Sequence, residues 1–396
     1  MRRLLVLVCS IVLVDAMLFG ALGPLVPGYA DEFELSKAGA GLLVGAFGAG
    51  ALFGGIPGGL AAARYGAKPA VLAGLVLLAA ASFAFAAAGG PWGLGVARFV
   101  QGFSSTVTWA GAFAWLMVAA PRARRGELIG VAFGAAVFGA IVGPMFGAIA
   151  KEVSIRATFG AVGLVALALA GWAAAHRSSP AEGESRSSFR RAFRDPGFLG
   201  GLWLNTLPAL LFGLLVVLVP LRLDAAGWSV LAIGSVFFGA GLLETAVNPF
   251  LGRFSDRRGR LLPIRGALAA SIAVAVAFAV VDDPVAVAVL AALAAVTFGG
   301  FYTPGIALVS DRADVVGLTQ GLGFGIMNTA WALGNMSGPS IGGALAEVGG
   351  DALPYSLAAA LCALTLLASF RVSLPESGSA PAPSERPADA SHSAAR

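Results

Sequence analysis

The sequence predicts an all-α membrane protein with twelve transmembrane helices in two related halves. Of its 396 residues, 58% are hydrophobic and only 12% are charged, whereas soluble domains carry about 25% charged residues. The apolar residues form about twelve stretches that are long enough to cross a hydrocarbon core about 30 Å thick. A stretch rich in glycine, residues 130–148, also recurs at residues 325–343, which indicates an internal duplication.

Short polar connections separate the predicted spans. We place the spans at residues 4–27, 40–62, 69–89, 93–118, 127–149, 156–175, 197–220, 229–251, 262–281, 284–308, 318–345 and 353–371. The basic start followed by apolar residues is similar to a signal peptide. The apolar run continues past Asp15 without a small-residue cleavage site, so we interpret it as a retained first helix.

The longest polar interruption before the tail, residues 176–196, divides the chain into two six-helix halves, residues 1–175 and 197–371. We interpret it as a cytoplasmic linker. The tail after this bundle, residues 372–396, is rich in Pro, Ser and Ala and has few residues to bury. Such a composition predicts a disordered cytoplasmic tail.

The distribution of basic residues predicts the orientation in the membrane. With the N-terminus inside, 21 of the 26 Lys and Arg residues fall on the cytoplasmic side and one, Arg98, falls within a span. The four on the other side are Lys37, Lys151, Arg156 and Arg222. This bias predicts that both termini are cytoplasmic. The Ala-rich, Lys-poor composition suggests a high-G+C bacterium, and therefore the inner (cytoplasmic) membrane.

The duplicated stretch contains glycines four residues apart, which form a stripe on one face of a helix. The first copy has Gly139, Gly143 and Gly147 with Pro144, and the second copy has Gly334, Gly338 and Gly342 with Pro339. A stripe without side chains lets another helix approach backbone to backbone. Each proline removes a helical hydrogen bond and bends the helix. One such stripe is common in helix packing, but two copies 195 residues apart indicate a duplicated bundle.

The connection after the eighth span, residues 252–260, reads GRFSDRRGR. Its motif residues are Gly252, Asp256, Arg257, Gly259 and Arg260. This stretch resembles the signature loop of the major facilitator superfamily, Gly-x-x-x-Asp-Arg-x-Gly-Arg. A tight turn needs glycine at positive φ. The resemblance implies that Asp256 and Arg260 belong to a latch that holds the outward-open state and breaks during turnover.

The equivalent connection after the second span, residues 59–68, is a degenerate copy of this signature. It keeps Gly59, Arg64, Gly66 and Lys68 but has Ala63 where the acid stands. This copy therefore lacks the anion of the latch, and a basic loop that sets orientation is the alternative interpretation.

Further elements resemble the drug:proton antiporter branch of the same superfamily. The Gly-Pro stretch of the fifth span is similar to the antiporter motif of that branch, and residues 98–102, RFVQG, are similar to its R-x-x-x-G element. The resemblance implies that Arg98 takes part in proton transfer or keeps a nearby acid ionised.

The first span, with residues 15–18, DAML, before residues 24–29, PLVPGY, resembles the first helix of vesicular amine transporters and bacterial multidrug exporters. In those relatives the acid faces the central cavity and meets a cationic substrate or a proton, which implies this role for Asp15. The vesicular transporters also carry acids in spans seven, ten and eleven. In spans seven and eleven this chain offers Asn205 and Asn328 instead. We therefore do not expect a direct vesicular amine transporter.

Charged residues within the spans are the main candidates for function. A carboxylate near the bilayer centre costs about 2.5–3.5 kcal/mol, so it usually lines a cavity or is paired. Asp15 is the first candidate, and a structural ion pair with Arg98 is the alternative for both residues. Glu244, placed about 10 Å from the cytoplasmic end of its span, lies one turn before Asn248. It is either a second protonation site or a support for the loop with Asp256.

Aromatic residues in the second half, Trp203, Phe301, Tyr302 and Trp331, either form a surface that binds cations or simply pack. We place a helix break next to Tyr302, at residues 303–305. The charged group Asp311, Arg312 and Asp314 is predicted to lie in a solvated loop.

These observations predict a secondary transporter that works by alternating access as a monomer, without cofactor or metal. Asp15 and the Gly-Pro elements favour proton-driven antiport of a hydrophobic or cationic small molecule. A proton-independent facilitator or importer of a neutral metabolite such as a sugar is the alternative. A non-transporting sensor is a remote one, because no soluble domain is appended. The sequence contains no phosphate loop and no catalytic triad pattern, so an enzyme is not predicted.

Overall fold

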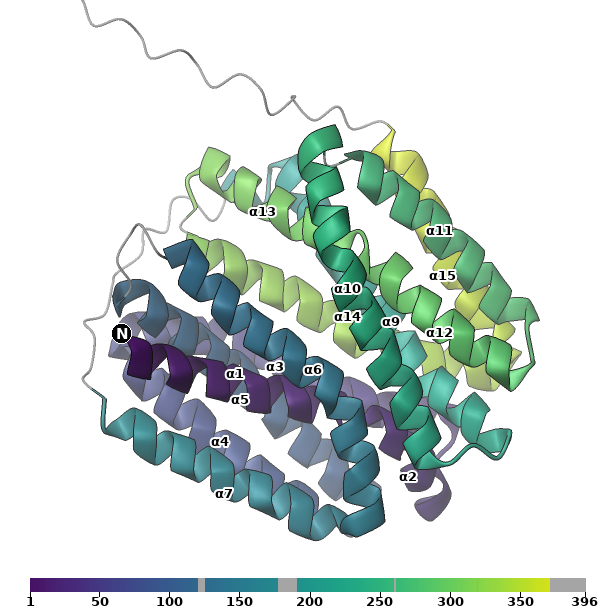
Figure 1. The fold of residues 1–396 in the computed structure, drawn as a ribbon, viewed down its shortest axis with the longest axis horizontal. Helices are drawn as coiled ribbons and strands as arrows, with labels where there is room; N and C mark the ends of the chain where they lie inside the picture. Colours follow the sequence, from purple (N-terminus) through teal and green to yellow (C-terminus); the bar gives the residue numbers. More distant parts are fainter. Residues whose placement is uncertain (120–124, 177–190, 260, 319, 371–396) are drawn as a thin grey trace, which may run out of the picture.

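The computed structural model describes residues 1–119, 125–176, 191–259, 261–318 and 320–370, and these residues form helices joined by short turns (Figure 1). The helices are α1 (Arg2–Gly20), α2 (Val26–Glu32), α3 (Lys37–Tyr65), α4 (Ala67–Ala87), α5 (Pro91–Ala119), α6 (Arg125–Val153), α7 (Ile155–Ala174), α9 (Pro196–Ala225), α10 (Val230–Arg258), α11 (Leu261–Val280), α12 (Pro284–Gly299), α13 (Tyr302–Val316), α14 (Gln320–Gly349) and α15 (Ala352–Ser369), with a 3-10 turn at Gly23–Leu25.

Nine helical segments of the described chain are long and apolar enough to cross a membrane. Together with α5, α14 and the consecutive helices α12 and α13, they account for the twelve predicted spans. The predicted all-α, twelve-helix fold class is thereby confirmed. We call α1 to α7 the N-terminal half and α9 to α15 the C-terminal half.

The first predicted span, residues 4–27, is not one helix. It ends at Gly20 and continues through a 3-10 turn into α2. Pro24 and Pro27 cause this interruption, because neither can donate a backbone hydrogen bond to the preceding turn. The largest buried apolar cluster joins this region to α9, with Leu25 and Val217 among its members.

The tenth span is also interrupted. Helix α12 ends at Gly299, and α13 begins at Tyr302 and runs to Val316. The break therefore lies slightly before the predicted position. The charged residues at 311–314 lie in α13, so the prediction of a solvated loop there is wrong.

Two glycines with positive φ end α3 and α10, as the turn requirement predicted. Gly66 has φ of 95° and Gly259 has φ of 79°, and the two positions are 193 residues apart in the sequence. Helix α10 continues to Arg258, so most of the predicted signature loop is the last two turns of this helix. The turn itself is confined to the glycine, because only glycine adopts this conformation without strain.

The glycine stripes pack each repeat against the first helix of its own half. At Gly139 and Gly143 an added Cβ atom would lie 2.3 and 2.6 Å from backbone oxygens of α1, and at Gly147 it would lie 1.9 Å from the oxygen of Ala21, the C-cap residue of α1. At Gly334 and Gly338 it would lie 2.2 Å from backbone oxygens of α9. Gly342 meets the Leu214 side chain of α9 at 2.1 Å. The predicted close approach is confirmed in both halves, since no larger side chain fits at these contacts.

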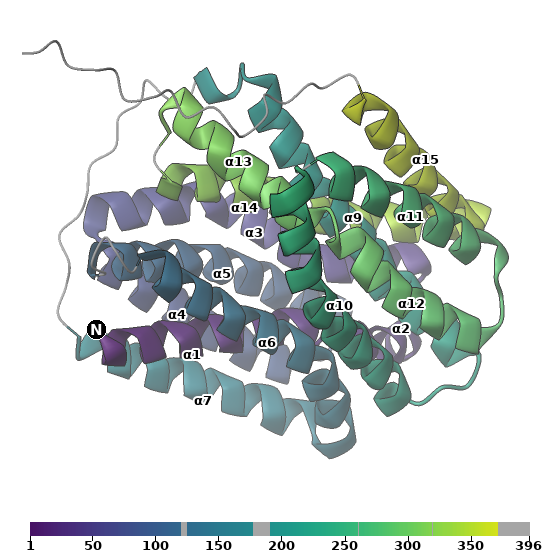
Figure 2. The ribbon, with the colours of Figure 1, turned by 45° about the horizontal axis from the view of Figure 1, so that its top comes forward.

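The two halves meet through α3 and α14 and through α6 and α10. A Cβ atom added to Gly41 of α3 would lie 2.2 Å from the Pro339 oxygen, and one added to Gly234 of α10 would lie 2.8 Å from the Ala148 side chain. Both contacts lie toward the end of the bundle that carries Lys37. At the other end, the start of α1 and the end of α10 point apart (Figures 1 and 2).

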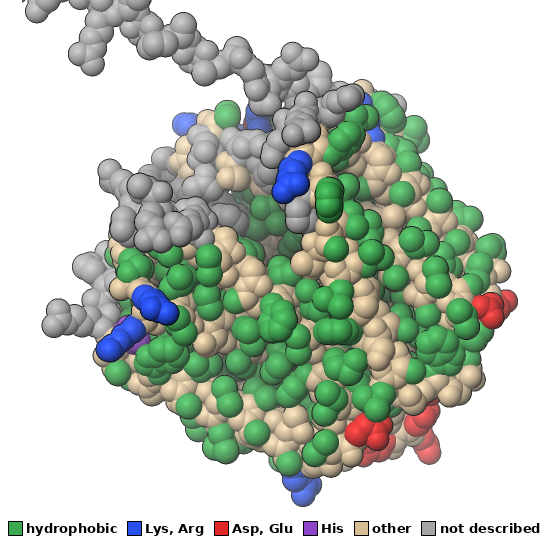
Figure 3. Space-filling model, in the orientation of Figure 1, with side chains coloured by type: hydrophobic (Ala, Val, Ile, Leu, Met, Phe, Trp, Pro, Cys, Tyr) green, Lys and Arg blue, Asp and Glu red, His purple; other side chains and the backbone are tan. Residues whose placement is uncertain are grey.

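Charge differs between the two ends of the bundle. We call the end with Lys37 the acidic side and the end with Arg2 and Arg253 the Arg-rich side. The acids of the acidic side are Asp31, Glu32, Glu34, Glu152, Asp224, Asp282, Asp283, Glu347 and Asp351. In Figure 3 the acidic side chains gather at the lower right and most basic ones at the upper left, with a broad hydrophobic surface between them. This pattern is typical of a protein that crosses a membrane.

Candidate functional site

Asp15 lies in the middle of the N-terminal half, on the face of α1 that meets α5. Its side chain is buried, with 3% of the residue exposed. The Ser105 hydroxyl and the Trp109 indole N–H both donate to its Oδ2 atom, at 2.6 and 2.7 Å. The Oδ2 atom is thus held by two neutral donors, which do not cancel the charge of the carboxylate.

Arg98 is also buried but does not pair with Asp15. Its Nη1 atom donates to the Leu18 oxygen at 3.2 Å and to the Gln101 Oε1 atom at 3.0 Å, and its Nη2 atom lies 3.5 Å from the Phe19 oxygen. These two carbonyls lie in the last turn of α1, where a helix leaves its oxygens without donors. The alternative of an Asp15–Arg98 ion pair is therefore not what the geometry shows.

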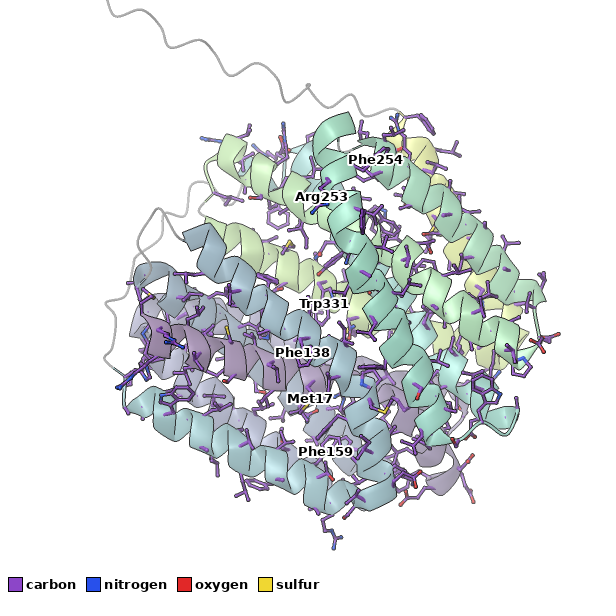
Figure 4. All side chains as sticks on the ribbon, in the orientation of Figure 1. Met17, Phe138, Phe159, Arg253, Phe254 and Trp331 are labelled. Carbon is purple, nitrogen blue, oxygen red and sulfur yellow. The ribbon has the colours of Figure 1, made fainter. Side chains whose placement is uncertain are left out.

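The two halves meet at an aromatic cluster close to Asp15 and Arg98. Phe19 of α1 has its ring centroid 5.1 Å from that of Phe47 and 5.4 Å from that of Trp331. The Arg98 guanidinium lies 4.9 Å from the Phe47 centroid. In Figure 4, Trp331 lies between the ribbons of the two halves. Trp331 thus joins α14 to the site of the N-terminal half, with Asn328 one turn before it on α14.

A second acidic position lies in the C-terminal half. Glu244 is at the midpoint of α10, about 21 Å from either end at 1.5 Å per residue, because this helix runs to Arg258. The apolar segment of this helix ends at Asn248, so Glu244 lies about 6 Å from the end of that segment, close to the predicted position near the cytoplasmic end. Asn248 shares a hydrogen bond with Glu244, and Tyr302 lies within electrostatic range of it. The structure brings these three residues together, in a different half from Asp15.

The other polar and aromatic candidates of the C-terminal half hold helices together. The Asn205 amide donates to the Met327 oxygen at 2.7 Å and thereby ties α9 to α14. The Trp203 indole donates to the Thr365 hydroxyl of α15 at 2.9 Å, and Phe301 is fully buried. The structure places Trp203 and Phe301 away from the Asp15 site.

The predicted latch falls largely outside the described part of the chain. Arg260 and the side chains of Asp256 and Arg257 lie outside the described part of the structure. The degenerate first copy has a structural contact instead. Lys68 donates to the oxygens of Ala174 and His176, at 2.7 and 2.6 Å, and so caps the end of α7.

Several polar contacts of the structure were not predicted from the sequence. Ser105 and Trp109 are four residues apart, a spacing that places both on one face of α5, and this signal was available. Arg312, predicted to be solvated, pairs with Asp195, the N-cap residue of α9. The bond between Arg312 Nε and Asp195 Oδ1 is 3.0 Å, and this guanidinium lowers the pKa of Asp195.

Comparison with solved structures shows the same fold elsewhere. A bacterial homologue of the human lysosomal transporter Spinster, in an inward-facing and unoccupied conformation, aligns over 93% of this chain and 95% of its own, with a TM-score of 0.75 and 14% identity. The occupied form of that homologue covers 93% and 94% with a TM-score of 0.70 and 14% identity. A variant of the nucleoside transporter NupG covers 93% and 99%, with a TM-score of 0.73 and 14% identity.

No curated protein sequence matches the chain. The sequence profile of the Major Facilitator Superfamily matches residues 8–323 and 227–394, which together cover nearly the whole chain. With the twelve-helix fold, the duplicated glycine stripes and the two glycine turns already described, this match identifies the chain as a multi-pass membrane transporter that belongs to the major facilitator superfamily.

Proposed function

We propose that this transporter is a proton-coupled antiporter that exports a hydrophobic or cationic small molecule, with Asp15 as the coupling acid. The main support for this proposal is the buried Asp15 carboxylate, which accepts hydrogen bonds from Ser105 and Trp109. It forms no ion pair with any basic residue whose side chain is described. A carboxylate in the membrane interior needs a proton or a cation to balance its charge. Proton binding and substrate binding can therefore exclude each other at this group.

The surroundings of Asp15 support a substrate with apolar and cationic character. Phe19 lies one turn after Asp15 on α1 and contacts Phe47 and Trp331. Aromatic faces attract cations and also accept apolar groups. Because Trp331 belongs to the C-terminal half, a substrate bound here would contact both halves, as alternating access requires.

The proposed direction of transport follows from the orientation in the membrane. Export from the cytoplasm needs the Arg-rich side to face inward, which the positive-inside rule supports. The halves pack at the acidic side and diverge at the Arg-rich side (Figure 1), so this conformation would load substrate from the cytoplasm. We further propose that the protein acts as a monomer in the inner membrane.

Proton flux in proteoliposomes tests the proposal. Purified protein is reconstituted with a pH-sensitive dye inside, a proton gradient is imposed, and a panel of lipophilic cations is added. We expect cation-triggered proton flux for wild type, none for Asp15→Asn, and unchanged flux for the control Asp31→Asn, whose residue is exposed on the acidic side.

Two outcomes would contradict the proposal. Flux that persists in Asp15→Asn would move the coupling away from this residue. If no cation triggers flux in wild type, the facilitator of a neutral metabolite becomes the better description, and uptake of labelled neutral solutes without a gradient would then be measured.

A further inference from the structure

The interruption between α12 and α13 is a second polar feature inside the membrane span. Helix α12 ends at Gly299, and Gly300 and Phe301 form a turn before α13 starts at Tyr302. The break lies near the middle of the combined span, residues 284–316. A helix that ends there leaves its last carbonyl oxygens without intrahelical donors and carries partial negative charge at that end.

Glu244 points its carboxylate at this helix end. Its Oε1 atom lies so close to Gly299 that a Cβ atom on that glycine would be 2.4 Å away from it. A residue with any side chain at position 299 would push the carboxylate away. The absence of a side chain therefore permits the approach of an acid from α10 to the backbone of α12.

This arrangement concentrates negative charge and oxygen atoms. An ionised carboxylate beside a helix C-terminus is unfavourable, and its position in the membrane interior adds to the cost. No basic side chain of the described residues forms an ion pair with Glu244. Asn248 shares a hydrogen bond with Glu244, and Tyr302 lies within electrostatic range of it, so an amide and a hydroxyl lie near the carboxylate. Such a site is stabilised by a bound positive charge.

We propose that Glu244, Asn248, Tyr302 and the carbonyl end of α12 form a binding site for a monovalent metal cation, Na⁺. Hard cations prefer oxygen ligands from carboxylates, amides and carbonyls, and interrupted membrane helices bind Na⁺ through their carbonyl ends. One carboxylate matches one positive charge. This site is separate from Asp15 and does not depend on the proposed proton coupling there.

The internal repeat places the two acidic sites at comparable depth. The 193-residue offset that relates Gly66 to Gly259 also relates Trp109 to Tyr302. Trp109 holds Asp15 in the N-terminal half, while Tyr302 lies near Glu244 in the C-terminal half. In each half, therefore, an acidic residue lies near an equivalent position along the fourth span.

Binding of ²²Na⁺ to purified full-length protein in lipid nanodiscs at pH 8 tests this site. We expect saturable binding that unlabelled Na⁺ displaces and choline does not. Glu244→Gln should abolish it. Gly299→Ala keeps the charge but displaces the carboxylate, so it should weaken the affinity at least tenfold. The control Gly239→Ala lies on α10, the helix of Glu244. An added Cβ atom there meets nothing within 4 Å, so this variant should bind like wild type.

Thermal unfolding with NaCl or choline chloride gives a second readout on the same variants, and it also reports whether each variant is folded. Wild type without saturable Na⁺ binding would overturn the proposal, as would a folded Glu244→Gln protein that still binds. Stabilisation by acid but not by Na⁺ would likewise overturn it and leave Glu244 a protonation site. Asp15→Asn should still bind Na⁺, so failure of this site and failure of proton coupling are distinguishable.

Discussion

An ion pair between the two halves contributes to closure of the acidic side, and Asp351→Asn should weaken this closure. Lys37 Nζ at the start of α3 lies 2.5 Å from Asp351 Oδ1, between α14 and α15, and Arg222 Nε lies 3.7 Å from Asp351 Oδ2. Asp351 makes no side-chain capping bond to α15. Its substitution by asparagine therefore removes charge without removing a helix cap.

The magnitude follows from exposure. The Lys37 side chain is 39% exposed and that of Asp351 is 19% exposed, so solvent screens the pair. Such pairs contribute about 0.2–1 kcal/mol. Arg222 keeps other partners, among them the Phe278 oxygen at 3.0 Å. Alternating access must separate Lys37 from Asp351. A loss of about 1 kcal/mol shifts the equilibrium toward the state open at the acidic side by about fivefold.

Distances between spin labels measure this shift. Labels at Glu34→Cys in the N-terminal half and Val285→Cys in the C-terminal half occupy exposed positions on the acidic side. The native Cys9 and Cys362 are replaced by alanine. Double electron–electron resonance should show a longer-distance population that grows in Asp351→Asn.

Asp282→Asn provides the matched control. Asp282 pairs with Arg222 at 3.2 Å within the C-terminal half, and its side chain is fully exposed, so the distances should not change. In a double-mutant cycle, Lys37→Gln should add little to Asp351→Asn, because each removes the same contact. An unchanged distance distribution in Asp351→Asn, or equal shifts in both aspartate variants, would refute the reasoning.

Three further predictions concern stability. Gly147→Ala places a Cβ atom 1.9 Å from the Ala21 oxygen, so overpacking should cost about 1–3 kcal/mol or more, whereas Gly134→Ala, which meets nothing within 4 Å, should leave the unfolding temperature unchanged. Asp195→Asn keeps a capping side chain on α9 but loses the charge paired with Arg312; we expect a loss of about 1–2 kcal/mol in reversible denaturation. The pKa of Asp195 is lowered in the folded state from an ordinary value of 3.8. The stabilisation by the charged pair is therefore present above about pH 3.8 and is lost as the pH falls below it. Acid titration should show that the stability difference between wild type and Asp195→Asn disappears at low pH.

The sequence alone determined the class and the repeat. Hydropathy specifies the spans, because the bilayer thickness demands a minimum length of apolar helix. The glycine stripes are also a local property, because residues four apart share a helix face. Their close contact with α1 and α9 could therefore be predicted, as could the glycine turns at Gly66 and Gly259.

Only the tertiary structure decided which groups meet. Ser105 binds Asp15 across 90 residues of sequence, and Arg312 binds Asp195 across 117. Such pairs depend on the rotation and depth of helices that pack together, and the helical period of one segment carries no information on its neighbour. The approach of Glu244 to Gly299 is a further case. The sequence indicates a helix break near Tyr302, but the acid that faces the end of α12 comes from another helix.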